Sequence, residues 1–304
     1  MGEKKSADVF KITLRNDYAF KRVFGTEENK AVLRDFLDCV LDIPTQDIAE
    51  LELLDKEFHN DSLDDKTGIL DVKLRLKNGT AIDIEIQNRW NDEFAQRTVF
   101  YWAKMYTENL QKGEVYTKLP KCITINIVGE GFKLNDLLHS EYRILERQLY
   151  MELSDELEIH FLNLAKAKDR QVPDSVIEAN TKTERLVNWL RFIETDEKEV
   201  RAMLADNSPV MEQANETVDV MLQDPKARWL YENRMKYEHD KASWEHFGYT
   251  KGVEAGKREG EAIGLEKGAY HNKLQTASSM KALNYPLTDI QKITGLSEAE
   301  IAQL

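Results

Sequence analysis

The segment that decides the fold is residues 69–87, ILDVKLRLKNGTAIDIEIQ. On each side of the central Lys77-Asn78-Gly79, apolar and polar residues alternate strictly, with the period of a half-buried β-strand. The apolar positions are Leu70, Val72, Leu74 and Leu76 in the first run and Ile82, Ile84 and Ile86 in the second. The segment therefore predicts a β-hairpin with one apolar face and one polar face.

The register of this hairpin depends on the length of its turn, because directly opposed residues share a face. A two-residue turn at Asn78-Gly79 would mix polar and apolar side chains on both faces. A three-residue turn that starts at Lys77, with Gly79 in the left-handed bulge position, keeps the faces separate. We expect this second register, which sets Asp71 directly opposite Glu85.

The repulsion between two carboxylates on one face of the hairpin must be offset. Like charges opposed across strands destabilise a sheet, and a hard divalent cation held by carboxylate and carbonyl oxygens compensates them. Asp71 and Glu85 are therefore candidate metal ligands. The same pattern is typical of the solvated face of a half-exposed hairpin, on which Lys73, opposite Asp83, and Arg75 neutralise the acids. Spacing alone leaves both interpretations open.

Outward from the hairpin, helical and strand patterns alternate up to about residue 165. We expect two helices within residues 16–42, an amphipathic helix over 92–112, and strands over 121–128, 141–153 and 157–164. Strands interleaved with helices indicate an α/β or α+β core. An Ala/Lys-rich segment around residues 165–175 marks the expected boundary between a domain over 1–175 and a helical region over 176–304.

The helical region contains a glycine at every fourth position in GYTKGVEAGKREGEAIGLEKG, from Gly248 to Gly268. Each glycine disfavours a helix by about 0.5 to 1 kcal/mol, which close contact with a second helix can offset. We expect an oligomerisation helix over about 225–272 that makes a homodimer; a frayed charged linker is the alternative. Two capping boxes, Thr288 with Gln291 and Ser297 with Glu300, predict a helix-turn-helix-like packing module over about 278–304.

The composition excludes several classes of protein. The 304 residues include 42 Lys and Arg against 55 Asp and Glu, so any DNA contact must be local and not a result of bulk positive charge. The sequence has neither an apolar run long enough to cross a membrane nor a secretory signal. Its two cysteines fit a reducing environment, so we expect a cytoplasmic protein.

Several motifs occur in a characteristic order: NDYAFKRVFG, GILDV, IDIEIQ, RTVFYWAKMYTENLQKGEVY, ITINIV and LEIHFLNL. Over roughly residues 10–175 this set resembles the recombination-promoting nuclease (Rpn) and transposase family of the PD-(D/E)xK nuclease superfamily. The resemblance implies a restriction-endonuclease-like α/β core, in which a mixed central sheet is flanked by helices. The all-α C-terminal region is an extension to that core.

The resemblance also assigns roles on the hairpin. It implies that Asp71 and Glu85 bind Mg²⁺ or Mn²⁺, with the main-chain carbonyl of Ile86 as a further ligand. Gln87 stands where most superfamily members have lysine and cannot supply a positive charge. Lys73, on the same face, is a candidate substitute, although it is equally a simple cross-strand partner.

In the helix that follows, Arg97 and Tyr101 match an Arg-x-x-x-Tyr motif and share one face. By resemblance they contact phosphate or support Glu85. Asp17 aligns with an acid that completes the metal site in some relatives, or it is simply a helix-start residue. We expect a metal-dependent DNA endonuclease that promotes recombination or derives from a transposase. The alternative is a catalytically weak or inactive DNA-binding or interaction protein of transposon origin.

Overall fold

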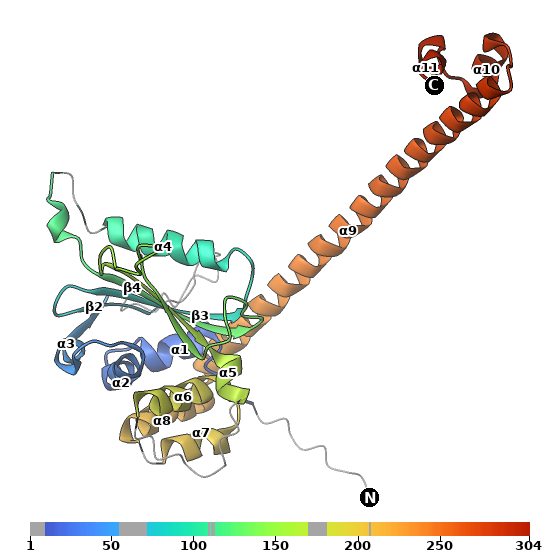
Figure 1. Ribbon diagram of the computed structural model, residues 1–304. Coiled ribbons are helices and arrows are strands. Elements are labelled where there is room, and N and C mark those ends of the chain that lie inside the picture. Colours follow the sequence, from blue (N-terminus) through green and yellow to red (C-terminus); the bar gives the residue numbers. More distant parts are fainter. Residues whose placement is uncertain (1–9, 55–71, 109, 111–112, 170–180, 207) are drawn as a thin grey trace, which may run out of the picture. The chain divides into compact units, whose positions relative to one another are not determined.

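The computed structural model describes residues 10–54, 72–108, 110, 113–169, 181–206 and 208–304 (Figure 1). The chain folds into two compact units, Met1–Met235 and Lys236–Leu304. The first unit contains the sheet, and the second is helical in its described residues.

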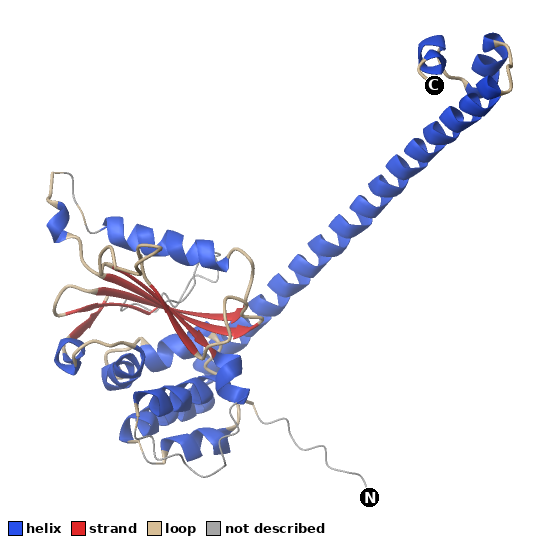
Figure 2. Cartoon of the chain, viewed as in Figure 1, coloured by secondary structure: helices blue, strands red, loops and turns tan. Residues whose placement is uncertain are grey.

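The first unit is built around a six-stranded sheet (Figure 2). Its strands are β1 (Leu51–Leu53), β2 (Val72–Leu76), β3 (Ala81–Arg89), β4 (Cys122–Glu130), β5 (His139–Tyr142) and β6 (Leu157–Asn163). Their spatial order is β1-β2-β3-β4-β6-β5, in which β3, β4 and β6 run parallel and the remaining pairings are antiparallel. The expected mixed central sheet flanked by helices is confirmed.

The hairpin β2–β3 has the register expected from its alternation. Lys73 is opposite Asp83, and Leu74 is opposite Ile82. The connection has three residues, with Gly79 at φ 90°, a left-handed conformation that costs little only for glycine. The Gly79 N–H donates to the Leu76 carbonyl at 2.9 Å and closes the turn.

The two faces of the sheet are covered differently, as Figure 1 shows. The isoleucine face of β3 packs in the main core with α1 (Asp17–Phe24) and α2 (Lys30–Val40). The other face lies beneath α4 (Phe94–Glu108), whose Phe94 packs against Val128 and Phe161. The polar side chains of β3 are therefore those that face α4.

Helices beyond residue 180 complete the main core. They are α6 (Lys182–Glu194), α7 (Lys198–Ala205) and α8 (Pro209–Gln223), and the smaller elements of the unit are α3 (Thr45–Ala49), η1 (Tyr116–Lys118) and α5 (Leu164–Asp169). Trp189 of α6 is buried, donates to Asp35 at 2.7 Å and contacts the ring of Phe24 at 5.5 Å. The expected boundary at residue 175 therefore does not separate two cores.

The strand expected over 141–153 is wrong for most of its length, because β5 ends at Tyr142. Beyond it the chain turns at Glu146, whose carboxylate accepts from the N–H groups of Gln148 and Leu149. Side chain to backbone hydrogen bonds of this kind compete with the ladder bonds of a strand. Apolar alternation in this segment therefore indicated a strand where local bonding makes a turn.

The second unit consists of α9 (Pro225–Ala282) from Lys236 onward, together with α10 (Leu287–Thr294) and α11 (Glu298–Ala302). The last turns of α9 bury Ala277 against Ile290 and Ile301. The capping box of Ser297 and Glu300 is confirmed. The one expected at Thr288 is wrong, because α10 starts at Leu287 and its N-cap is Pro286.

Candidate active site

The candidate site lies where α4 crosses the polar face of β3. Glu85 is buried, and the guanidinium of Arg97 donates to its Oε1. The same Arg97 nitrogen donates to Oε1 of Gln87 at 2.9 Å. Oxygen atoms from two side chains on one strand therefore converge on a single cationic nitrogen. The guanidinium also lies over the ring of Phe94, 4.7 Å from its centroid.

The backbone explains this convergence. Glu85 and Gln87 are two residues apart on one strand, so they point to the same face. Asn126 is the partner of Glu85 on β4 and accepts from the hydroxyl of Thr98 at 3.2 Å. Because Thr98 is next to Arg97 on α4, this buried bond fixes the helix above the strand. The site is therefore held by a strand, its parallel neighbour and one helix.

The donor atoms fit a hard divalent cation. A carboxylate and an amide oxygen are ligand types that Mg²⁺ and Mn²⁺ accept, and here they already share one positive partner. Ile86, whose carbonyl was expected as a further ligand, lies between Glu85 and Gln87 on β3, and its side chain packs in the main core. Asp71, the other expected ligand, lies outside the described residues.

A second acid lies on the same face. Asp83 has one carboxylate oxygen, Oδ1, that is buried and has no hydrogen-bond partner among the described residues. Burial raises the pKa of Asp83 to about 6, and the charge of Lys73, opposite it on β2, only partly offsets this effect. Lys73 itself is exposed. The structure therefore places Lys73 on the expected face, where it acts electrostatically on Asp83.

The remaining predicted site residues, Tyr101 and Asp17, lie on two different helices, α4 and α1. Tyr101 lies one helical turn beyond Arg97 and is 41% exposed. Asp17 is on α1, which packs in the main core, and its carboxylate accepts from Nε of Arg234 at 3.0 Å. Among the described residues, no hydrogen bond or ion pair joins Asp17 to Glu85 or Arg97.

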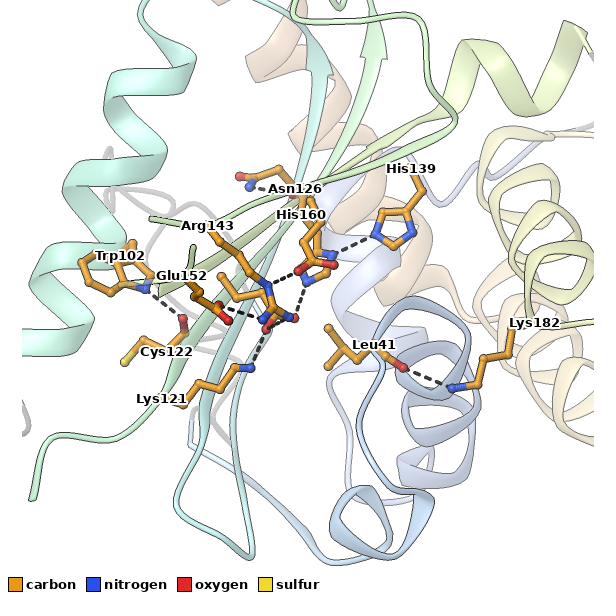
Figure 3. A network of polar contacts seen from close by, with 12 residues as sticks. Leu41, Trp102, Lys121, Cys122, Asn126, His139, Arg143, Glu152, His160 and Lys182 are labelled. Atoms are coloured by element: carbon orange, nitrogen blue, oxygen red, sulfur yellow. Dashed lines mark hydrogen bonds and ion pairs between the residues drawn. The ribbon is translucent and has the colours of Figure 1, made fainter. Parts of the chain in front are cut away.

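A polar network on the β5–β6 edge of the sheet was not predicted from the sequence (Figure 3). Glu158 is at its centre, with Lys121 at 2.5 Å, Arg143 at 3.1 Å and Nε2 of His160 at 2.7 Å. Burial alone would raise the pKa of Glu158, but hydrogen bonds from His160 and Lys121 lower it to about 2. His139 contacts Nδ1 of His160 at 2.8 Å, and burial lowers the pKa of His139 to about 4.

Among the described residues, Glu141, Glu158 and His160 are close enough to share a metal ion. Their carboxylates, however, are already paired with Arg143, and Glu158 also with Lys121. Both oxygens of Glu158 are engaged, Oε2 by Lys121 and Arg143 and Oε1 by His160, whereas Arg97 pairs with one oxygen of Glu85, Oε1. We therefore interpret the cluster as an ion-pair network that fastens β5 to β6. The sequence feature that could have indicated this network is the alternation of Glu158 and His160 along one predicted strand.

The profile of the PD-(D/E)XK nuclease family transposases matches residues 14–247. The chain belongs to this family. No curated protein and no solved structure matches it.

The family match includes the helices that complete the main core. It extends through α6, α7 and α8 and into α9, far beyond residue 175. In this member of the family, the helices that follow the sheet are therefore part of the segment that the family shares. None of the described helices is long and apolar enough to span a membrane.

Proposed function

We propose that this PD-(D/E)XK nuclease family transposase is a metal-dependent DNA endonuclease that hydrolyses phosphodiester bonds in recombination or transposition. The observation that carries the proposal is the convergence of Glu85 and Gln87 oxygens on one nitrogen of Arg97. Nuclease sites of this kind need oxygen ligands and a cation at one point. Family membership supports the reaction class.

Asp71 is proposed as the second acidic ligand. The alternation of the sequence is what supports this role: it predicts Asp71 opposite Glu85, although Asp71 itself lies outside the described residues. Cross-strand neighbours of this type have Cβ atoms roughly 4.5 to 5.5 Å apart. Two carboxylates at that spacing would complete a donor set for Mg²⁺ or Mn²⁺, together with the carbonyl of Ile86.

A bound Mg²⁺ or Mn²⁺ ion would lower the pKa of a water molecule and polarise the scissile phosphate. The chain's own residues have complementary tasks. The amide oxygen of Gln87 accepts a hydrogen bond and can orient the attacking water, but it carries no charge. Arg97, which contacts Gln87 directly, supplies positive charge for the phosphate, and Lys73 adds charge from the neighbouring strand. Tyr101 and Asp17 are proposed to assist substrate binding.

We also propose that the chain is a cytoplasmic homo-oligomer. Glycines from Gly248 to Gly268 recur every four residues on α9, and a Cβ added at any of them would meet no atom within 4 Å. A second copy of α9 can approach such a stripe closely. An oligomer would allow two sites to act on two strands or two DNA ends.

Plasmid cleavage tests the nuclease. Purified wild-type protein is incubated with supercoiled plasmid and Mg²⁺, Mn²⁺ or EDTA, beside Asp71→Ala, Glu85→Gln and the control Glu52→Gln. Glu52 is an exposed acid on β1, outside the group formed by Glu85 and Arg97. We expect nicking by wild type and Glu52→Gln only, and only with metal. An inactive wild type with a normal circular dichroism spectrum would favour the weak or inactive DNA-binding protein.

A further inference from the structure

Beside the candidate site, the outer side of α4 carries aromatic side chains that the fold does not bury. Phe100 is 65% exposed and Tyr101 is 41% exposed, and their ring centroids are 5.5 Å apart in an edge-to-face arrangement. Tyr101 is one turn from Arg97, whose guanidinium contacts Glu85. Exposed rings one helical turn from Arg97 would lie within reach of a substrate bound at the proposed site.

Basic residues stand on both sides of the two rings. Arg97, Phe100, Tyr101 and Lys104 occupy positions i, i+3, i+4 and i+7 of α4, which form one stripe along a helix. Lys104 pairs with Glu108 at 3.7 Å, but both side chains are more than half exposed, so the pair is weak. The stripe therefore has the order cation, two aromatic rings, cation.

We propose that this stripe, Arg97, Phe100, Tyr101 and Lys104, is a stacking platform for an unpaired nucleotide of the DNA substrate. The substrate class would then be single-stranded or locally unpaired DNA. This inference rests on the proposed nuclease function, because the stripe is identified as a substrate contact by its position beside Arg97, which contacts Glu85.

The charge of the chain favours stacking over a purely electrostatic contact. With a net charge of -13, the protein has little long-range attraction for a polyanion. Stacking of a base on an aromatic side chain raises affinity by roughly 5- to 100-fold and does not depend on net charge. In a duplex the base faces are stacked on each other, so only an unpaired base can use Phe100. Lys104 would meet an adjacent phosphate.

The stripe fits a nucleotide better than a protein. A stable protein interface buries about 800 Å² on each partner and needs a broad apolar centre. On α4 the exposed Val99 adjoins Phe100, and the other exposed neighbours of the rings are polar: Gln96, Lys104 and Thr107. Two rings between cations match the size and charge of a single nucleotide.

Binding by the cleavage-deficient variant Glu85→Gln tests the proposal without requiring cleavage. Fluorescence anisotropy compares a fluorescein-labelled oligo-dT with a duplex of the same length in EDTA. We expect tighter binding of oligo-dT and a loss of roughly 5- to 100-fold when Phe100→Ala is added, with an unchanged salt dependence. Phe100→Tyr should retain the affinity, and Lys104→Gln should reduce the salt dependence.

Val99→Ala is the matched control, since Val99 is 50% exposed on the same helix and adjoins Phe100. Equal affinity for oligo-dT and duplex, or equal losses for Val99→Ala and Phe100→Ala, would overturn the platform. So would a Phe100→Ala protein that changes only its sedimentation coefficient, because the rings would then bind a second copy.

Plasmid cleavage by the wild type separates the proposed nuclease from the proposed platform. Cleavage without a Phe100 effect removes only the platform, whereas Phe100-dependent binding without cleavage removes only the nuclease.

Discussion

Arg97 of α4 donates a hydrogen bond to the buried carboxylate of Glu85 on β3. This contact joins the helix to the strand through charge as well as packing. It also has a consequence for metal binding, because the guanidinium and a metal ion would use the same carboxylate oxygen. Arg97 must then compete with the metal for Glu85 or move toward the phosphate when the metal binds.

Replacement of Arg97 by methionine separates these effects. Arg97→Met removes the ion pair with Glu85 and should lower the free energy of unfolding by about 2 kcal/mol in EDTA. We expect Mn²⁺ to bind more tightly to the variant in isothermal titration calorimetry, because the competing cation is gone. Cleavage should nevertheless become slower. Weaker Mn²⁺ binding would show that Arg97 supports the metal ligand instead of competing for it.

Lys133→Met is the control for this experiment. Lys133 pairs with Asp92 at 3.4 Å, and both side chains are largely exposed. An exposed pair contributes about 0 to 1 kcal/mol, so stability, metal affinity and cleavage should all stay close to wild type.

Gly129 allows β3 and β4 to approach each other just beyond Gln87. A Cβ at this position would lie 2.4 Å from the carbonyl oxygen of Asn88. Because that atom belongs to the backbone, the strands would have to separate. Gly129→Ala should therefore lower the free energy of unfolding by more than about 2 kcal/mol in urea titrations. Gly252→Ala, whose Cβ would meet no atom within 4 Å in the single chain, should have the opposite sign and raise helicity at a concentration at which the chain is monomeric. Equal stability of Gly129→Ala and wild type would contradict the close approach.

The glycine stripe of α9 predicts the oligomeric state. Gly256→Leu with Gly260→Leu fills the stripe with large side chains, and we expect sedimentation equilibrium to shift toward monomer. Ala262→Leu adds the same bulk two residues from a stripe glycine, on another side of the helix, and should leave the oligomer intact. A wild type that is monomeric at all concentrations would remove the proposed oligomer.

The hairpin shows what the sequence could predict. Strict alternation and the position of Gly79 were sufficient for the register, because a slip by one residue would move Ile84 to the polar face. The helices that became α1, α2 and α4 were predicted from their apolar spacing. In each case the relevant contacts lie within one element or between adjacent strands.

Long-range contacts set the limit of prediction. Trp189 packs against Phe24, which is more than 160 residues earlier, and no local pattern indicates such a pairing. The network of Glu158 also depends on Lys121 and Arg143, which come from separate segments. For the candidate site, the alternation predicted that Asp83 and Glu85 share a face, and the family resemblance predicted that Arg97 could support Glu85, but neither indicated that Arg97 also contacts Gln87. That contact depends on how α4 packs on the sheet.

The buried network predicts how stability depends on pH. Burial lowers the pKa of His139 to about 4, so the unfolded chain takes up a proton below about pH 6.5 that the folded chain does not. Stability should therefore fall as the pH falls from about 6.5 to 4. Glu158, with its pKa lowered to about 2, extends the loss from about pH 4.5 downward. For the partly exposed His139 we expect a contribution of about 2 kcal/mol.

His139→Gln tests this prediction, because an amide can still donate to Nδ1 of His160 but does not titrate between pH 4 and 6.5. Urea unfolding at pH 7.0, 6.0 and 5.0 should show a smaller loss of stability in the variant than in wild type. His246→Gln, at an exposed position of α9, should parallel wild type. If all three proteins lose stability equally, the acid sensitivity arises from carboxylates elsewhere. A variant that is less stable at pH 7.0 but less sensitive to acid would still support the burial of a neutral His139, because the hydrogen bond and the proton uptake are separate effects.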